Sequence, residues 1–392
     1  MTGPADAAAQ LIASGDRRVI TAGVCATLLG VGLQRFAYAP LLPAMVQQHW
    51  LSAGDAGLLG ATNFAGYLIG AAIAPNIGRH RGMRPALRGA TLLAVVCFAL
   101  CAWRGGPFGA GLAWYLPWRL LAGVSGGVLM VLAGPAIQQA VAPARRAFAA
   151  GTMFTGVGAG VAIGALIVPA LLPFGLAAAW LALAVAAVLL TVIAWPRWPL
   201  VPGPPRVRMP PLRGSVARLL ASYTLGGAAA APHMGWWPDF IARGLGYGTS
   251  WGSAAWLVFG LAVAGGAQLS GWLAGRIGVA RAFLVIMAVQ VPATLLPLIS
   301  VSVPALLLST LLAGSTTAGS SVLALTRARE LSVEGAPGLW RASTIGWAAA
   351  QTGCGFALAW LYRVTGSHLP LFAVGLVAAL AAALLAIPVR DR

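Results

Sequence analysis

The sequence predicts an all-α membrane protein of twelve transmembrane helices, arranged as two pseudo-symmetric halves of six helices each. Three observations lead to this fold class. The chain is 59% hydrophobic and 8% charged, whereas soluble domains are roughly 45–50% apolar and about 25% charged. Its apolar residues gather in runs of about twenty, each long enough to cross roughly 30 Å of hydrocarbon. A proline-rich segment separates the sixth run from the seventh.

Apolar windows bounded by Arg, Pro and Gly place the spans along the chain. We expect a helix in each, because only helices and closed barrels satisfy the backbone in lipid, and the two-residue alternation of barrel strands is absent. The predicted spans are 19–47, 53–78, 86–104, 110–141, 147–172, 174–195, 216–242, 251–275, 281–300, 303–326, 341–363 and 368–388.

The arginines predict the orientation of the chain in the membrane. All 25 basic residues are arginines. With the N-terminus in the cytoplasm, twenty of them lie on the inner side, and only Arg104, Arg243 and Arg363 lie on the outer side. Because short cytoplasmic loops carry an excess of Lys and Arg, we expect a multi-pass protein of a bacterial inner membrane with both termini cytoplasmic. Tryptophans near the predicted span ends fit an interfacial belt, among them Trp103, Trp236, Trp237, Trp251 and Trp340.

Several functions are excluded by what the sequence lacks. The net charge of +18 comes from short blocks between apolar runs, with no basic helix that could follow a nucleic acid. The four cysteines lie in apolar runs without the His or carboxylate that a metal site needs. No phosphate-cradling loop or activated nucleophile is present, so we predict no cofactor, no metal and no enzymatic activity. Residues 1–18 do not resemble a signal peptide, so we expect the first span to be retained.

Residues 196–215 divide the chain into two halves. This segment, PRWPLVPGPPRVRMPPLRGS, holds seven prolines and four arginines and is predicted to be a cytoplasmic connector. It separates an N-terminal half, 1–195, from a C-terminal half, 216–392. An offset of about 195 residues aligns LLPAMVQQHW with WWPDFIARGL, so that Pro43 meets Pro238. Internal repeats of this kind are common in transporters.

On the same offset, the segments after the second and eighth spans read PNIGRHRGMRPAL and GWLAGRIGVARAFL. The second resembles the G-x-L-A-D-R-x-G loop signature of the major facilitator superfamily, through Gly271, Arg276 and Gly278 together with Leu273 and Ala274. The family's Asp, which helps to latch the two halves, is replaced by Gly275 here and by Arg79 in the first half, where little more than Gly82 is kept.

Two further segments carry the resemblance. RLLAGVSGG, with Arg119, Gly123 and Gly127, is similar to the family's R-x-x-x-G pattern in the fourth span. GVGLQRFAYAPLLPAM in the first span resembles the YbfB/YjiJ-type branch of the superfamily. The resemblance covers nearly the whole chain. It implies the major facilitator fold, a cavity between the halves at the middle of the membrane, and secondary transport by alternating access.

Two arginines are the most informative candidates for a substrate site. Arg35 lies some sixteen residues into the first span, about 24 Å at 1.5 Å per residue, where a charge costs at least ~2.5–3.5 kcal/mol. Arg119 lies in the fourth span and faces the same cavity if the family fold holds. None of the seven acidic residues is predicted at mid-membrane. Either the arginines bind an anionic group of the substrate, or they hydrogen-bond helix carbonyls and fix helix packing.

Neutral polar residues on helical stripes could complete such a site. Gln34 and Tyr38 lie four apart on the first span, and Asn63 and Tyr67 lie with Gly66 and Gly70 on the second. A stripe of this kind serves either helix packing or ligand contact. Further stripes are Thr344, Trp347 and Gln351 in span eleven, and the hydroxyls Ser309, Thr316, Thr317, Ser320 and Ser321 in span ten.

The seventh span adds a candidate for proton coupling. His233 lies among Gly226, Gly227, Pro232 and Gly235, which imply a kinked helix, and a histidine can exchange a proton near neutral pH. The alternative is a neutral, buried histidine. Asp239 is interpreted as an outer-gate or helix-end charge and not as the partner of Arg35. Asp55, three residues after Ser52, predicts a capping box.

Together these features predict a secondary active transporter of a small organic solute, with an anionic substrate and proton coupling as hypotheses. The glycines at 156, 160 and 164 resemble those of the fifth helix in family exporters, which favours export. The alternatives are uptake of an organic anion, or a non-transporting membrane sensor or scaffold that kept the fold. The expected partners are the solute and membrane lipid, and we expect a monomer.

Overall fold

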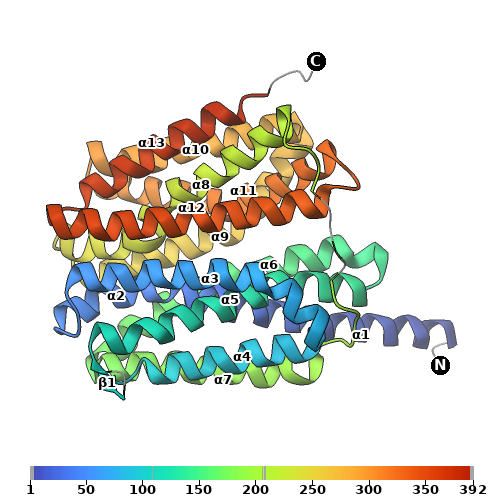
Figure 1. Cartoon of the computed structure of the whole chain (residues 1–392), viewed down its shortest axis with the longest axis horizontal. Helices are drawn as coiled ribbons and strands as arrows, with labels where there is room; N and C mark the ends of the chain where they lie inside the picture. The colour runs from blue at the N-terminus through green and yellow to red at the C-terminus, as the bar shows by residue number, and fades with distance from the viewer. Residues whose placement is uncertain (1–3, 108, 205, 207–208, 389–392) are drawn as a thin grey trace.

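The computed structural model describes residues 4–107, 109–204, 206 and 209–388. Its helices run side by side in two layers (Figure 1). The N-terminal layer holds α1 (Pro4–Thr27), the π-helix η1 (Leu28–Phe36), α2 (Tyr38–Gln47), α3 (Ala53–Arg81), α4 (Met83–Leu100), α5 (Leu112–Ala140), α6 (Arg146–Leu171) and α7 (Leu176–Ala194). The C-terminal layer holds α8 (Gly214–Asp239), the π-helix η5 (Phe240–Gly244), α9 (Thr249–Ile277), α10 (Val279–Ile299), α11 (Val303–Leu331), α12 (Ala336–Thr365) and α13 (Leu369–Ala386).

The predicted spans all fall on helices. Within the described residues, ten helical segments are long and apolar enough to cross a membrane. The two other long helices are α8, with 26 residues, and α12, with 30 residues. Both carry polar and charged residues within their length, among them His233 and Asp239 on α8 and Gln351 and Arg363 on α12. The all-α fold predicted from the apolar runs is confirmed.

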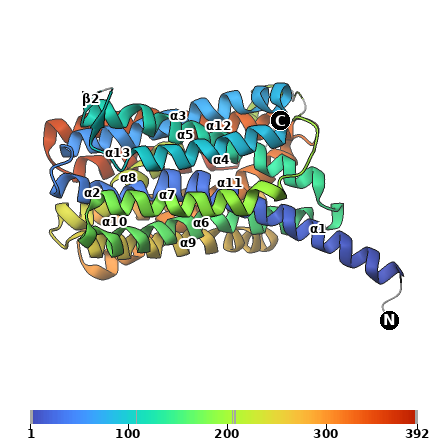
Figure 2. The ribbon, with the colours of Figure 1, turned by 90° about the horizontal axis from the view of Figure 1, so that it is seen from below.

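The first span differs most from its prediction. It was expected over 19–47, but the helix begins at Pro4 and is followed directly by η1 and, after Ala37, by α2. Figure 2 shows α1 extending beyond the rest of the bundle. Inside η1 the backbone lies very close to its neighbours: a Cβ at Gly32 would lie 2.6 Å from the Cα of Gly160, and one at Gly30 would lie 2.9 Å from the Cβ of Leu129. π-Helical turns are rare and often occur at functional sites, and this one carries Arg35.

The two segments that resemble the family's loop signature form turns at equivalent places. Gly82 (φ 86°) joins α3 to α4, and Gly278 (φ 82°) joins α9 to α10. Both adopt a backbone conformation that favours glycine. Gly271 lies in α9, within the predicted span, but the expectation that Arg276 lies in a loop is wrong, because α9 continues to Ile277 and carries both residues within its last two turns.

The two ends of the bundle differ. Both termini and the connector lie at one end, here named the connector end (Figure 1). Short turns and a two-stranded hairpin, β1 (Gly105–Gly106) with β2 (Gly109–Ala110), lie at the opposite end. The connector contacts both halves, since Gly203 lies against the backbone of Arg79 and Pro210 lies against Gly335. Arg208, Arg390 and Arg392, predicted to be cytoplasmic, lie outside the described residues.

Each half has its own apolar core, and the halves meet mainly along two helix pairs. One core cluster is built from α1 to α7, and a second is built mainly from α8 to α13. Across the boundary, α6 packs against α9, and α3 packs against α12. Glycines allow the first contact, because a Cβ at Gly158 would lie 2.7 Å from the carbonyl oxygen of Gly260. The cavity that holds Arg35 lies between these two pairs.

Candidate functional site

A cavity of about 80 Å³ lies between the two halves. At roughly 10–15 Å³ for each water, this is room for about five to eight water molecules. Its lining comes from η1, α3, α5 and α6 of the first half and from α8, α9, α11 and α12 of the second. The lining residues are Val31, Arg35, Phe36, Tyr67, Met130, Phe154, Val157, Tyr223, Met234, Val263, Thr317, Ala318, Ser321, Trp340, Thr344 and Trp347.

Arg35 is the only charged residue of this lining. It is 8% exposed, and its guanidinium carbon lies 4.7 Å from the ring centres of Phe64 and Tyr67. The ring of Phe36 lies 5.7 Å away. Aromatic faces attract a cation, but they do not replace the hydrogen bonds that its N–H groups make in water. Within the described chain, Arg35 has no carboxylate partner, and its buried Nε has no hydrogen-bond acceptor.

The wall supplied by the second half is aromatic. The ring of Tyr223 on α8 lies 4.7 Å from that of Trp347 and 6.1 Å from that of Trp340, both on α12. The Tyr223 hydroxyl lies 2.8 Å from Ser321 Oγ on α11. Sequence reasoning missed Tyr223 and assigned Trp340 to an interfacial belt. The position of a tryptophan near a span end does not show whether its side chain points into the protein or toward the lipid.

The exposure of the tryptophans agrees with an interfacial belt for some of them and contradicts it for others. Trp103 and Trp251 are exposed, 55% and 61%, near the opposite end, as an interfacial position requires. Trp236 and Trp237 are buried. Trp237 Nε1 donates to Thr310 Oγ1 over 2.9 Å, which shows that its polar edge is satisfied inside the protein.

Most of the hydroxyls at the cavity are occupied by their own helices. Thr317 donates to the carbonyl of Ala313 over 2.9 Å, and Thr344 donates to that of Trp340 over 2.9 Å. Ser321 lies 3.5 Å from the carbonyl oxygen of Thr317 in addition to its contact with Tyr223. The hydroxyl-rich stripe predicted for span ten therefore reaches the cavity with two members, Thr317 and Ser321, and these offer few free donors.

Four predicted site residues form a separate cluster inside the first half. Gln34, Tyr38, Asn63 and Arg119 are buried to 3% exposure or less, and none of them lines the cavity. Arg119 Nη1 donates to the Gln34 carbonyl over 3.1 Å, and Asn63 Nδ2 donates to the Arg119 carbonyl over 3.1 Å. The Arg119 guanidinium lies 4.3 Å from the ring of Tyr38. The expectation that Arg119 shares the cavity of Arg35 is wrong, because its face of α5 packs against η1, α2 and α3.

Close helix contact explains the stripe on the second span. A Cβ at Gly66 would lie 2.0 Å from the carbonyl oxygen of Leu120, and one at Gly70 would lie 2.2 Å from that of Val124. On α5, a Cβ at Gly123 would lie 2.1 Å from the carbonyl oxygen of Asn63. Of the four stripe residues, only Tyr67 reaches the cavity. The packing alternative therefore holds for Asn63 and the glycines.

Gln351 and His233 lie behind the cavity wall. The Gln351 amide nitrogen contacts the sulfur of Met234, which itself lines the cavity, over 2.6 Å. His233 Nε2 lies 2.9 Å from Ser309 Oγ, which donates to the Ala293 carbonyl over 2.7 Å. The His233 ring packs at 4.6 Å from Trp237 and 5.3 Å from Phe372. This is the environment of a buried, hydrogen-bonded histidine.

Asp239 lies at the opposite end and is fully buried. Arg243 donates to both of its carboxylate oxygens over 2.6 Å, and His368 Nε2 lies 2.8 Å from Oδ2. Asp239 is therefore not paired with Arg35, in agreement with its interpretation as a helix-end charge. The sequence did not reveal His368, because it lies in the turn between two spans and far from Asp239 in the chain.

Polar contacts between the halves lie at the middle and at the opposite end. Asp55 on α3 forms an ion pair with Arg363 on α12. The ring of Trp236 lies against Gly57, where a Cβ would be 2.2 Å from Cζ2. The indole nitrogen of Trp256 donates to the Phe36 carbonyl over 2.8 Å. Ser52 caps the start of α3 as predicted, because its Oγ accepts a hydrogen bond from the backbone N–H of Asp55 over 3.1 Å.

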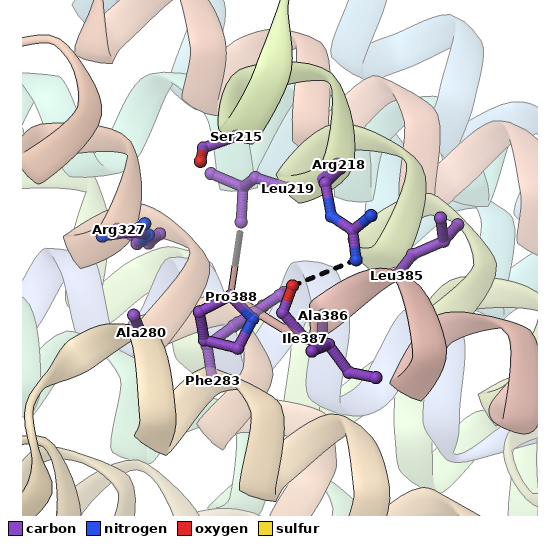
Figure 3. Close-up of a pocket in the computed structure, with 10 residues that line it drawn as sticks. All are labelled: Ser215, Arg218, Leu219, Ala280, Phe283, Arg327, Leu385, Ala386, Ile387 and Pro388. Atoms are coloured by element: carbon purple, nitrogen blue, oxygen red, sulfur yellow. Dashed lines mark hydrogen bonds between the residues drawn. The ribbon is translucent and has the colours of Figure 1, made fainter. Parts of the chain in front are cut away.

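A second cavity, of about 30 Å³, lies within the C-terminal half at the connector end (Figure 3). Arg218 on its rim donates to the carbonyls of Leu384 and Ile387, over 3.1 and 3.0 Å. Cations commonly satisfy the last carbonyls of a helix in this way. Arg218 therefore caps the end of α13, and the space beside it is too small for an organic substrate.

Comparison with known proteins agrees with the predicted family and fold. The family described as "Uncharacterised MFS-type transporter YbfB" matches residues 27–387. No curated protein matches the chain. A D-xylose-proton symporter superposes with a TM-score of 0.70 and 15% identity, over 93% of this chain and 96% of that chain. The human organic anion transporter MFSD10 (TETRAN) superposes with a TM-score of 0.70 and 19% identity, over 95% and 99%. The resemblance stated from the motifs is confirmed.

Proposed function

Because this chain belongs to the YbfB-type family of major facilitator transporters, we propose that it carries a small organic anion across the membrane by secondary active transport, with Arg35 as the residue that binds the anion. Transporters with paired halves place substrate at the interface of the halves and expose it alternately to the two sides. The cavity between the halves is the place where this chain would hold its solute.

The observation that carries the proposal is the state of Arg35. A guanidinium stays protonated in proteins, and burying a charge without a partner is costly. Arg35 is buried and faces the cavity, and within the described chain it lies beside aromatic rings, forms no ion pair and has no hydrogen-bond acceptor for its Nε. A carboxylate or a similar anion in the cavity would supply the countercharge and accept hydrogen bonds from its N–H groups.

The arrangement of the halves supports access from the connector end. The polar contacts that join the halves lie from Phe36 and Trp256 outward to Asp55 and Arg363. The cavity lining extends in the other direction, toward Met130 in the second half of α5 and Trp340 near the start of α12. With the arginine-rich connector end in the cytoplasm, the cavity would receive solute from the cytoplasmic side in this conformation.

The direction of net transport and its coupling stay predictions. The glycines that favoured export have a packing role, since a Cβ at Gly156 would lie 2.5 Å from the Val24 carbonyl and one at Gly164 would lie 2.7 Å from the Cβ of Ala37. His233, the candidate for proton coupling, packs between α8, α11 and α13 and not at the cavity. Export and proton coupling therefore rest on the sequence alone.

A thermal-shift screen of the purified protein tests the proposal, because a ligand stabilises the state that it binds. Organic anions and lipophilic cations are screened against the parent, Arg35→Gln, and Arg329→Gln as a control at an exposed arginine on α11. We expect some of the anions to raise the melting temperature of the parent and the control but not of Arg35→Gln. Stabilisation by cations alone, or by anions equally in all three proteins, would overturn the proposal.

A further inference from the structure

The lining of the Arg35 cavity narrows the class of anion, and this inference rests on the proposed function. Among the residues that the structure describes, only one charged side chain lines the cavity. A monoanion would neutralise it, whereas a dianion would bring a second charge with no partner among the lining residues. Because an unpaired charge in such surroundings is expensive, the cavity discriminates in favour of a single negative charge.

The surroundings of Arg35 also restrict how that charge is held. The rings of Phe64 and Tyr67 contact the guanidinium at 4.7 Å, and they fix its position without accepting its in-plane hydrogen bonds. The N–H donors of the Arg35 guanidinium lie in one plane and form a fork that matches the two oxygens of a carboxylate. A monocarboxylate therefore fits this group better than a solute that offers only hydroxyls.

The remainder of the cavity offers little to a polyhydroxylated body. Thr317 and Thr344 donate to their own helices, and Ser321 is already paired with Tyr223. A sugar-like body would leave several of its hydroxyls without partners, and each buried polar group without a partner costs free energy. An apolar body has no such cost.

The shape of the wall favours a flat ring. Tyr223, Trp340 and Trp347 present neighbouring aromatic rings, and stacked or edge-to-face ring pairs are favourable at separations of 4.5–7 Å. Met130 and Met234 complete the apolar lining with side chains that adapt to an irregular ligand surface. The volume of about 80 Å³ is smaller than the roughly 150 Å³ of a cavity that binds benzene, so a single ring would be admitted only as the halves move apart.

We propose that the substrate is an aromatic monocarboxylate, with its carboxylate on Arg35 and its ring against Tyr223, Trp340 and Trp347. Size, charge and ring are then recognised by different parts of one cavity. Arg35, in the first half, binds the charged group, and the aromatic wall, in the second half, contacts the ring. A ligand that touches both halves at once is suited to link their movements.

Calorimetric titration of the purified full-length protein with four matched probes tests this inference. Benzoate carries the ring and the charge, benzamide lacks the charge, acetate lacks the ring, and phthalate adds a second carboxylate. We expect benzoate to bind the parent at least about tenfold more tightly than each of the others. Loss of a charge-assisted hydrogen bond or of the ring contacts each weakens binding by about this factor. Because the probes are compared on the parent protein, this result does not depend on the folding of any variant.

Two substitutions on one helix separate the ring contact from a general effect. Trp347→Leu removes a cavity ring, and we expect it to weaken benzoate about fivefold while leaving acetate unchanged. Trp360→Leu is the matched control, because Trp360 is 64% exposed on the same helix; we expect no change with either probe. Melting temperatures of the free proteins confirm that both variants are folded.

The outcomes distinguish this inference from the proposed function. If acetate binds as tightly as benzoate, the ring specificity is overturned, and if phthalate does, the specificity for a single charge is overturned. In either case, anion transport stands if Arg35→Gln abolishes this binding. If benzamide binds as tightly as benzoate and Arg35→Gln has no effect, both are overturned. If benzoate does not bind the parent, the inference is overturned, and anions found in the thermal-shift screen would leave the proposed function in place.

Discussion

At the scale of single residues, the two intramembrane arginines have different surroundings. Arg35 borders the cavity between the halves, whereas Arg119 lies inside the first half with one hydrogen bond to the Gln34 carbonyl and the ring of Tyr38 beneath it. Both are buried and both lack a carboxylate partner among the described residues. Only the first can meet a solute in the cavity.

We therefore predict that Arg119→Met leaves the affinity for anions within about twofold of the parent, a difference of ~0.4 kcal/mol. Met has a similar length and removes a buried charge whose Nε and Nη2 have no partner, so the variant should remain folded. Titration of the variant and of Arg35→Gln with the same anion measures the difference. A loss in Arg119→Met as large as that in Arg35→Gln would contradict the separation of the two sites.

His233 gives a second prediction at this scale. Its ring is held by Ser309, Trp237 and Phe372 and does not line the cavity. We expect the pH profile of transport by His233→Asn in proteoliposomes to superimpose on that of the parent. A profile that becomes flat, with counterflow of solute retained, would instead identify His233 as the residue that takes up the proton.

The sequence predicts intramembrane polar residues better than it predicts their directions. Arg35 was found because a charge inside an apolar run needs an explanation. Arg119 and Asn63 were assigned to the same cavity because helical spacing shows which residues share a face, but not which helix that face meets. Tyr223 and Trp340 were missed because an aromatic residue in an apolar span is equally expected in a core, at an interface or in a site.

At the scale of helices, glycines set how closely the spans approach. α3 and α5 meet backbone to backbone through Gly66, Gly70, Gly123 and Gly127. Small residues allow such contact where lipid gives no hydrophobic drive for association. The contact holds Tyr67, and with it one wall of the cavity, against Arg35.

We predict that Gly66→Ala destabilises the protein by about 1–3 kcal/mol, because the added Cβ would lie 2.0 Å from a backbone carbonyl oxygen that cannot move freely. Gly271→Ala is the matched control within α9, since nothing lies within 4 Å of its added Cβ; alanine should be neutral or slightly stabilising there. Thermal unfolding in detergent gives the comparison. Equal melting temperatures for the two variants would show that the α3–α5 contact is not tightly packed.

The positions of the helices were largely predictable, and their irregularities were not. Apolar runs and arginine blocks mark the spans because the bilayer sets the length of a crossing helix. No such sequence pattern predicts the π-helix at 28–36. There the backbone packs closely against α5 at Gly30 and against α6 at Gly32. The last residues of α9 were likewise not marked, because the helix continues from the predicted end at Gly275 to Ile277 before the turn at Gly278.

At the scale of the whole molecule, the distribution of arginines orients the protein. Among the arginines that the structure describes outside the spans, only Arg104, Arg243 and Arg363 lie at the opposite end. On the positive-inside rule we propose that the connector end lies in the cytoplasm, and this orientation would decide which side of the membrane the cavity faces.

We predict that green fluorescent protein fused after Arg392 is fluorescent in cells and that alkaline phosphatase fused at the same place is inactive. A fusion after Arg104, in the hairpin turn at the opposite end, should give the reverse pattern, because that turn lies outside the membrane in this orientation. Phosphatase activity at the C-terminus would contradict the orientation and would reverse the side from which the cavity is reached.

Entrance counterflow of labelled benzoate tests the central claim most directly, because it requires binding and movement of the halves but no driving gradient. The parent, Arg35→Gln and Trp360→Leu are reconstituted in proteoliposomes preloaded with unlabelled benzoate. We predict transient accumulation of label with the parent and with Trp360→Leu, and a rate reduced at least about tenfold with Arg35→Gln. Equal accumulation with all three proteins would contradict the role of Arg35 in transport, and none with the parent would contradict an aromatic monocarboxylate as the substrate.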